Sequence, residues 1–235
     1  EMLKKLRFEK MNLPSLKYIT QAGGKLSMKL SAEFADICAD KGIEFYVMYG
    51  QTEATARMSY LPWEYANTKV GSIGVAIPGG KFWLEDENGN VIKKNDTIGE
   101  LVYQGDNVTM GYAESCFDLQ NDDENNGILR TGDLAKIDPD GFYYITGRNK
   151  RFLKMYGNRV NLDEIEELIR TAGYDCVCTG TDDNLKIYIT EPDDKDRIVS
   201  YIAKCTGINR AAFSFVHIDK IPRNDSGKVQ YAALN

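Results

Sequence analysis

The feature that most constrains the fold is a strand–helix–strand pattern near the start of the chain. Residues 16–22, LKYITQA, predict one strand, and residues 43–50, IEFYVMYG, predict another. Gly42 suits the position that follows the end of the helix between them. The apolar residues of that helix share one face: Leu30, Phe34, Ile37 and Cys38. Because a helical crossover joins parallel strands, we expect an α/β layer over residues 1–68.

The loops that follow the two strands are the first candidates for a ligand site, since ligands bind beyond the carboxyl ends of parallel strands. These loops are AGGKLS and YGQTEAT. In the second, Tyr49 offers a flat face for a base, Thr52 a hydroxyl for phosphate and Glu53 a hard carboxylate for Mg²⁺. A strand that leaves the sheet through Gly50 into a polar turn is the plainer interpretation.

From about residue 69 the chain changes to short strands separated by turn residues. GKFWLED and GELVYQG flank an ENGN turn, and LAKID and FYYITG flank PDG. This punctuation indicates an antiparallel, barrel-like β subdomain over residues 69–148. The acidic tract NDDENNG at 121–127 is expected to be an exposed loop.

A third pattern follows Arg148. Asn161 is predicted to cap a helix with Glu164 at its third position. The apolar stripe of that helix is Leu162, Ile165, Leu168 and Ile169. The strands DCVCTG and LKIYIT, a helix over about 195–206, the strand FSFVH and a polar tail complete the chain. The expected fold class is therefore α/β and α+β, with a small α+β domain over 149–235.

Composition narrows the classes of function. Of the 235 residues 43% are hydrophobic, enough for a substantial core, and the net charge of −6 argues against a general nucleic-acid surface. No apolar run approaches the length of a membrane span. Five cysteines without a framework spacing favour a reducing compartment, so we expect a cytoplasmic location. Cys176 and Cys178 would share one strand face, but without a matching pair or a nearby His they make a poor metal site.

Two further segments could carry chemistry. Asp133 could accept both hydroxyls of a ribose, and Arg148 could reach ribose or phosphate, although a hairpin with a surface ion pair explains both residues. In IPRNDSGKVQY, Lys228 lies in a Gly-containing loop after Pro222. A solvated Lys in a mobile tail is the plainer interpretation of that segment.

Taken in order, these segments resemble the motifs of the adenylate-forming enzymes, which include acyl-CoA synthetases, peptide-synthetase adenylation domains and luciferases. The matching segments are YGQTE, GELVYQGDNVTMGY, RTGDLAKID, DGFYYITGR, KRFLKMYGNRVNLDEIE and PRNDSGK. The resemblance covers essentially the whole chain. It implies a ligase that uses ATP and Mg²⁺ to activate a carboxylic acid as an acyl-adenylate and then passes the acyl group to a thiol. YGQTE favours coenzyme A over a carrier-protein phosphopantetheine as acceptor, since peptide-synthetase domains more often have Pro after the Gly.

The resemblance also implies roles for individual residues. The residues matched to nucleotide binding are Gly23, Gly24, Tyr49, Gly50, Thr52, Asp133 and Arg148, and Arg159 matches a basic residue that supports the second half-reaction. The catalytic set is Lys228, Thr52 and Glu53, with Glu53 as the Mg²⁺ ligand. Residues 1–148 would belong to the large AMP-binding domain, and 149–235 would rotate about Lys150. That rotation would exchange Lys228 for the loop around Gly157 between half-reactions.

One motif of the family has no counterpart here. Its Ser/Thr/Gly-rich phosphate loop with a Lys lies upstream of the first predicted strand, and GSIGVAIPGG at 71–80 lacks Lys and hydroxyls where they are needed. Together with the start at Glu1, this predicts the C-terminal half of a longer enzyme, inactive without its N-terminal half. Two alternatives stay open: a carrier-protein-loading adenylation domain, and a non-catalytic nucleotide-binding module on the same fold.

Overall fold

The structure, a computed structural model, comprises two compact units. Unit 1 consists of Glu1–Thr131 and Ala135–Ile145, and unit 2 of Gly132–Leu134 and Thr146–Asn235. The described residues are 2–24, 26–149, 151–190, 194–224 and 227–234. The predicted hinge residue Lys150 lies outside them, as does the side chain of Arg159. The predicted domain boundary at residue 148 stays a prediction.

The first part of unit 1 is a four-stranded sheet with one long helix. Its elements are α1 (Met2–Lys5), β1 (Tyr18–Gln21), α2 (Met28–Lys41), β2 (Glu44–Tyr49), β3 (Ser59–Leu61) and β4 (Val75–Ala76), with 3-10 turns at Phe8–Lys10 and Trp63–Tyr65. The sheet order is β1-β2-β3-β4. β1 and β2 are parallel, with Tyr18 opposite Glu44, whereas β3 and β4 join antiparallel. The predicted strand–helix–strand unit is therefore confirmed.

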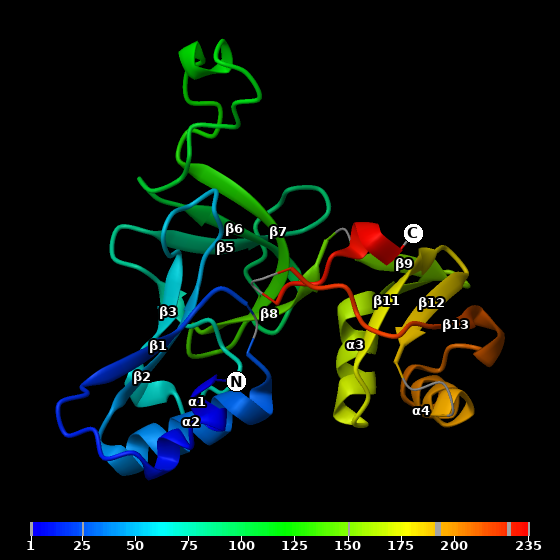
Figure 1. Cartoon of the computed structure of the whole chain (residues 1–235). Helices are drawn as coiled ribbons and strands as arrows, with labels where there is room; N and C mark the ends of the chain where they lie inside the picture. Colours follow the sequence, from blue (N-terminus) through cyan, green and yellow to red (C-terminus); the bar gives the residue numbers. More distant parts are fainter. Residues whose placement is uncertain (1, 25, 150, 191–193, 225–226, 235) are drawn as a thin grey trace. The chain divides into compact units, whose positions relative to one another are not determined.

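Local sequence explains the position of α2. Ser27 caps its first turn through the side-chain oxygen, and Gly42 ends it with a φ of 67°. Its buried face packs on one face of the sheet, as Figure 1 shows. The buried residues of this cluster are Phe8, Phe34, Ala35, Cys38, Ile43, Phe45 and Ala66.

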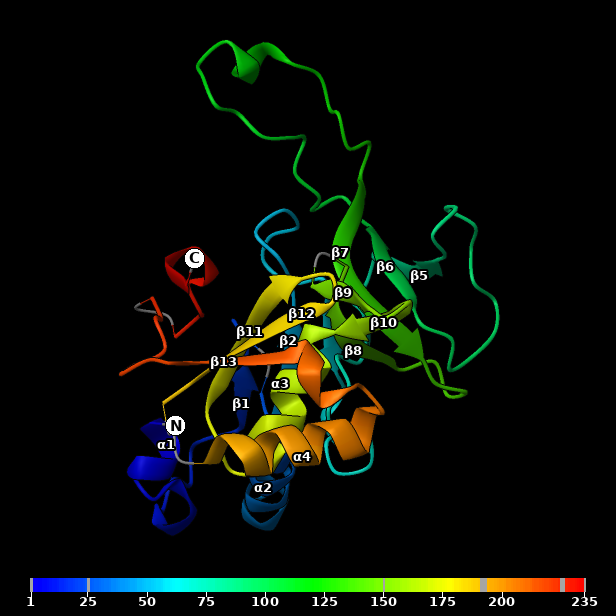
Figure 2. The same ribbon diagram turned by 90° about the vertical axis from the view of Figure 1, so that its right-hand side faces the viewer.

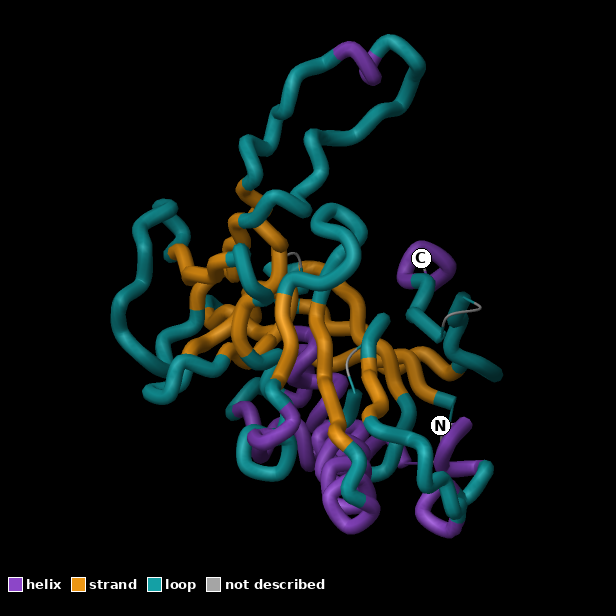
Figure 3. The backbone as a smooth tube through the Cα atoms, turned by 90° about the vertical axis from the view of Figure 1, so that its left-hand side faces the viewer, coloured by secondary structure: helices purple, strands orange, loops and turns teal. Residues whose placement is uncertain are grey.

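The second sheet forms the predicted antiparallel β subdomain, but it is an open sheet and does not close like a barrel. Its strands are β5 (Lys81–Glu85), β6 (Gly99–Gln104), β7 (Ile128–Ile137) and β8 (Tyr143–Arg148), in that order. Because β5 and β8 are its two edges, the sheet is open among the described residues. β7 and β8 each have residues in both units. The loop between β6 and β7, with a 3-10 turn at Asp118–Gln120, projects away from its sheet and carries the predicted acidic tract (Figure 3).

Unit 2 has a β-hairpin, a three-stranded sheet and two helices. Its remaining elements are β9 (Phe152–Met155), β10 (Asn158–Asn161), α3 (Leu162–Thr171), β11 (Cys176–Thr181), β12 (Asn184–Ile189), α4 (Lys195–Thr206) and β13 (Phe213–His217), with 3-10 turns at Arg210–Ala212 and Tyr231–Leu234. The sheet order is β11-β12-β13, which Figure 2 shows side by side. Asn161 caps α3 by accepting the Asp163 N–H, as predicted. The β9–β10 hairpin is an addition that the sequence pattern did not predict.

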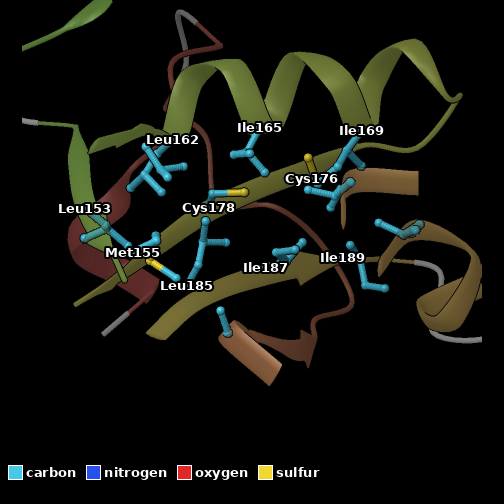
Figure 4. Close-up of a cluster of buried hydrophobic side chains, with 14 residues drawn as sticks. Leu153, Met155, Leu162, Ile165, Ile169, Cys176, Cys178, Leu185, Ile187 and Ile189 are labelled. Atoms are coloured by element: carbon cyan, nitrogen blue, oxygen red, sulfur yellow. The ribbon is translucent and has the colours of Figure 1, made fainter. Parts of the chain in front are cut away.

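The sheet of unit 2 is buried on both faces. One face packs on α3 and α4, and Figure 4 shows Leu162, Ile165 and Ile169 directed toward Cys176 and Cys178. The other face contacts the C-terminal segment. The residues of that second cluster are Val177, Tyr188, Ile221 and Leu234, with Val216, Ile218, Val229 and Tyr231 packed against them. The predicted polar tail therefore forms a layer of the core.

The two cysteines of β11 belong to this core. Both are fully buried, and burial, with the hydrogen bond to Cys176, raises the pKa of the Cys178 thiol well above its usual range. None of the helices in the described parts of the chain has the length and apolarity needed to cross a membrane.

Candidate functional site

The YGQTEAT segment forms a tight loop after β2. Tyr49 ends the strand, and its carbonyl accepts the Met58 N–H at 2.9 Å. A Cβ on Gly50 would lie 3.1 Å from the backbone of Ala56 and of Arg57, so the returning chain passes close to this glycine. The loop is thus folded back on itself at the carboxyl end of a parallel strand, where the sequence predicted a ligand site.

A second segment, the loop start at 106–112, holds this loop in place. The Thr109 N–H donates to the Glu53 carbonyl at 2.8 Å. The Asn107 side-chain amide donates to the carbonyls of Ala54 and Arg57 at 3.3 and 3.0 Å. The sequence analysis did not predict a role for Asn107. The only feature that could have indicated one is its position in the GDNVTMGY motif. The predicted Mg²⁺-binding loop therefore rests on hydrogen bonds to residues some fifty positions away.

Glu53 has a specific partner in that segment. The Tyr112 hydroxyl donates to Glu53 Oε1, and this hydrogen bond is the main cause that lowers the pKa of the Glu53 carboxyl. The same bond raises the pKa of Tyr112. Thr52 lies beside Glu53 and is exposed. A charged carboxylate next to an exposed hydroxyl suits a cation and a phosphate.

The donor set fits Mg²⁺ bound together with nucleotide phosphates. Among the described residues, no group of three His, Cys, Asp or Glu side chains could hold a metal by itself. Mg²⁺ usually takes one or two carboxylates and completes its shell with water and substrate phosphates. Glu53 can supply such a carboxylate.

The glycine loop after β1 is open. Gly23 has a φ of 91°, a conformation that favours glycine, and the Gln21 amide donates to the Gly24 carbonyl at 2.6 Å. A Cβ on either glycine would meet no atom of the described residues within 4 Å, its own chain neighbours aside. The loop leaves room along its backbone for a flat ligand to approach.

In unit 2, Asp133 and Arg148 form an ion pair of unequal exposure. Arg148 Nε donates to Asp133 Oδ1 at 3.1 Å. The Asp133 side chain is 6% exposed, whereas that of Arg148 is 67% exposed. The plainer interpretation, a surface ion pair, is therefore wrong for the carboxylate. An acid placed this deep on β7 has a defined orientation, as recognition of a ribose requires.

The strand end that carries Arg148 is anchored to α3. A Cβ on Gly147 would lie 2.1 Å from the Asn161 side-chain nitrogen, so any larger residue would displace the Asn161 amide. Asn161 donates to the Thr146 carbonyl at 3.1 Å while it caps α3. One asparagine thus orients the end of β8 and starts the helix.

Lys228 lies on a hydrogen-bonded turn and is exposed. Its N–H donates to Asn224 Oδ1 at 2.9 Å, and its carbonyl accepts the Asn224 N–H at 2.9 Å. Arg223, at the start of this turn, pairs with Asp175 at 3.1 Å. The backbone of Lys228 is therefore held, unlike that of a Lys in a free tail. The sequence analysis did not predict this role of Asn224. An Asn four positions before the lysine could have indicated it, because Asn side chains often accept backbone N–H groups in turns.

The predicted site residues lie in five places: the glycine loop after β1, the loop after β2, the Asp133–Arg148 pair, the Lys228 turn and the β9–β10 hairpin. Tyr49, Thr52 and Glu53 share one loop of unit 1, and Asp133 contacts Arg148 in unit 2. Lys228 lies on its own turn of unit 2. Arg159 is opposite Lys154 in the β9–β10 hairpin.

Comparison with known proteins gives consistent matches. The family profile described as "AMP-binding enzyme" matches residues 1–113. A 2-succinylbenzoate–CoA ligase of Bacillus cereus (strain Q1) is 35% identical over 134 residues, which are 57% of this chain and 27% of that relative. The o-succinylbenzoate CoA synthetase of Bacillus subtilis, solved in complex with the acyl-adenylate intermediate OSB-AMP, matches with a TM-score of 0.76 and 25% identity. That match covers 99% of this chain and 49% of the other.

The same Bacillus subtilis synthetase in complex with ATP and magnesium ion matches with a TM-score of 0.72 and 25% identity, over 97% of this chain and 48% of the other. The chain therefore spans about half the length of these solved relatives. Its match to the curated relative covers about a quarter of that protein.

Proposed function

Because this chain belongs to the adenylate-forming (AMP-binding) enzyme superfamily, we propose that it is part of an ATP-dependent, AMP-forming acid–CoA ligase. In the first half-reaction a carboxylate oxygen attacks the α-phosphorus of ATP, an acyl-adenylate forms and pyrophosphate leaves. In the second, the sulfur of a thiol attacks the acyl carbon, a thioester forms and AMP leaves. The chain supplies groups for both steps.

Lys228 carries the electrostatic part of the first step. Both reactants are anionic, and negative charge gathers on the α-phosphate as the new bond forms. A compact ammonium group placed there stabilises that charge. Asp133 would bind the ribose hydroxyls, with Arg148 beside it, and Tyr49 would stack on adenine. The glycines at 23, 24 and 50 let the backbone approach the ligand.

Thr52 and Glu53 would hold the phosphate end of the nucleotide. Thr52 donates a hydroxyl to a phosphate oxygen, and Glu53 provides a carboxylate for Mg²⁺. When bound, Mg²⁺ offsets the phosphate charge. The hydrogen bond from Tyr112 lowers the pKa of the Glu53 carboxyl and so favours the ionised form that a metal ligand needs.

The observation that carries the proposal is the turn around Lys228. A module that only binds a nucleotide needs no lysine on a separate, hydrogen-bonded turn, whereas a ligase needs a cation at the transferring phosphate. Both hydrogen bonds to Asn224 fix the backbone of Lys228. This supports the ligase over the non-catalytic alternative.

The two relatives reported above support coenzyme A as the acceptor, since one is named a CoA ligase and the other a CoA synthetase. Their printed substrate, 2-succinylbenzoate, is the first carboxylic acid to test. We extend the proposal to a rotation of residues 149–235 about Lys150 between half-reactions. In that rotation Lys228 would leave and Arg159 would support thioester formation. Most of the acyl pocket and the remaining phosphate contacts would come from other parts of the enzyme.

Pyrophosphate exchange tests the proposal. The full-length protein that contains this chain is incubated with ATP, labelled pyrophosphate and a panel of carboxylic acids that includes 2-succinylbenzoate. Exchange that depends on one acid, and that is lost in Lys228→Ala, is the expected result. Thioester formation is then compared with coenzyme A and with a phosphopantetheinylated carrier protein. Absence of exchange with every acid, together with unaltered ATP binding, would favour the binding module.

A further inference from the structure

The C-terminal segment that carries Lys228 ends on an aromatic contact that no role above uses. Tyr231 lies three residues after Lys228 and begins the 3-10 turn Tyr231–Leu234. The guanidinium carbon of Arg151 lies 4.1 Å from the centre of the Tyr231 ring. At this distance an Arg over a tyrosine ring is attracted by the electrons of its face, more strongly when water is excluded. Both residues belong to unit 2.

Arg151 is held in one orientation by a buried acid. Its Nη2 donates to Glu166 Oε1 at 2.5 Å and to the Cys178 carbonyl at 3.2 Å. The Arg151 side chain is 13% exposed and that of Glu166 only 3%. Arg151 Nε also lies 2.9 Å from Asp163 Oδ1, an ion-pair contact without hydrogen-bond geometry.

Glu166 is in turn fully engaged. Its Oε1 also accepts the Cys178 N–H at 2.8 Å, and its Oε2 accepts from Arg170 Nη2 at 2.7 Å. Burial acts to lower the pKa of Arg151, but the charges of Glu166 and Asp163 outweigh it and raise the pKa. The guanidinium is therefore charged and fixed in plane, a rigid platform for a ring.

The rest of the segment is anchored on either side of Tyr231. The Tyr188 hydroxyl donates to the Leu234 carbonyl at 2.6 Å, and the Gln230 N–H donates to the Pro222 carbonyl at 2.9 Å. Between these anchors the Tyr231 ring adds a contact that links the Lys228 turn to α3 and β11 through Arg151 and Glu166, beside the packing of Val229 on the same sheet. Loss of the ring would leave the segment attached but free to shift.

From these contacts we infer that Tyr231 and Arg151 are positioning residues for Lys228. The stack sets where the ammonium group lies relative to the core of unit 2. Arg151 also directly follows the predicted hinge residue Lys150 in sequence. A rotation at the hinge would thus move Arg151, Tyr231 and Lys228 as one piece. The inference rests on the proposed function, because it concerns the lysine of the first half-reaction.

The test replaces the ring in the full-length enzyme. Tyr231→Leu keeps an apolar side chain but removes the face that Arg151 contacts, and Tyr231→Phe keeps that face. Tyr201→Leu, on α4 of the same unit, is the matched control for loss of a tyrosine. We expect Tyr231→Leu to lower kcat for pyrophosphate exchange by about 10–100-fold, because small displacements of a reacting group are costly. KM for ATP should change little, and Tyr231→Phe should restore most of the rate.

A second readout separates positioning from folding. Thioester formation from supplied acyl-adenylate does not use Lys228, so it should stay near wild type in Tyr231→Leu. Equal loss of both half-reactions would show a structural role and overturn the inference. So would a rate for Tyr231→Leu that matches Tyr201→Leu.

Hydrogen exchange distinguishes failure of the inference from failure of the proposed function. In Tyr231→Leu the amides of Lys228 and Gln230 should exchange about tenfold faster or more, while the Cys178 amide keeps its protection. Unchanged exchange at Lys228 and Gln230 overturns the inference and leaves the proposed function standing. If Lys228→Ala itself adenylates at the wild-type rate, the proposed function fails, and the inferred role of Tyr231 fails with it.

Discussion

Side chains alternate between the two faces in both the β1–β4 sheet and the β11–β13 sheet. The two sheets differ in how deeply those faces are buried. In β11, Cys176 and Cys178 face the helices while Val177 faces the C-terminal segment, and all three are fully buried. In the first sheet Phe45 is 4% exposed beneath α2, whereas Tyr18 is 60% exposed. Tyr18, Tyr46 and Tyr60 lie in a row, with ring centres 6.5 and 6.4 Å apart.

This contrast shows what the C-terminal segment does in unit 2. In unit 2 it closes the second face of the sheet, so the candidate catalytic lysine is carried by a part of the core. In unit 1 the candidate Mg²⁺ ligand is carried by a loop that hydrogen bonds from residues 107 and 109 hold in place, together with the buried side chains of Ala54 and Met58. Disturbance of the two candidate sites should therefore have different costs.

The largest expected effect is on the core of unit 2. Ile187→Ala removes a fully buried side chain and should lower the free energy of unfolding by about 2–5 kcal/mol. Tyr18→Ala, on the exposed face in unit 1, should cost less than about 1.5 kcal/mol, the worth of an aromatic pair. Amide hydrogen exchange of the 235-residue chain measures each unit separately. Equal costs would mean that the two sheets are not buried differently.

The next effect is catalytic and concerns Lys228. In the full-length enzyme Lys228→Ala should lower kcat for adenylation by ~10²–10³-fold, the loss expected for one electrostatic donor, while the second half-reaction continues from supplied acyl-adenylate. Asp133→Asn should instead raise KM for ATP as well as slow the first step, since ribose is bound before and during transfer. Steady-state kinetics of pyrophosphate exchange separates the two. A Lys228→Ala enzyme at the wild-type rate would contradict the assigned role.

A smaller effect is expected where one side chain supports a loop through hydrogen bonds. Asn107→Ala leaves the carbonyls of Ala54 and Arg57 without this donor, at a cost of about 1–3 kcal/mol. The loss should appear as faster exchange of amides at 54–58, with the core of unit 2 unchanged. Asn88→Ala, in an exposed turn of unit 1, is the control. If exchange quickens equally in both variants, Asn107 does not support the loop.

The smallest expected effect is a change in the pKa of Glu53. The hydrogen bond from Tyr112 lowers the pKa of Glu53, so it stabilises the fold above the pKa of the unfolded state, and this contribution is lost as pH falls through the lowered value. Tyr112→Phe should raise the pKa of Glu53 toward the ordinary glutamate value of about 4.3. NMR titration of the Glu53 carboxyl carbon measures it, with Tyr18→Phe as control. No rise in Tyr112→Phe would show that the contact does not persist in solution.

Much of the fold follows from the sequence because its signals are local. The period of α2, the glycine at its end and the cap at Asn161 act within a few residues, and each predicts its element. The strands β11, β12 and β13 are likewise short apolar runs bounded by turn residues. The β9–β10 hairpin was missed because its strands have four residues each and mixed polarity, too short for a clear period.

The candidate site divides in the same way. The residue types, Glu53, Asp133 and Lys228 among them, are legible in the sequence, since each lies in a short motif. The residues that hold these side chains in place cannot be read from the motifs. Tyr112 is 59 positions from Glu53, and such a pair forms only when the topology brings the two loops together. Nor does a motif reveal that Asp133 is buried, or that the segment after Lys228 packs on a sheet.

Most of the helices and strands, the parallel start of the first sheet and the chemistry that the chain can offer are therefore predictable from the sequence alone. Three features are visible only in the tertiary structure: the second sheet is open, Asn224 accepts the Lys228 N–H, and Arg151 lies over the Tyr231 ring. The two kinds of information differ in the distance along the chain over which they act. Backbone propensity and periodicity act over one or two turns of chain, whereas burial and side-chain pairing are settled only when distant segments have packed and excluded water between them.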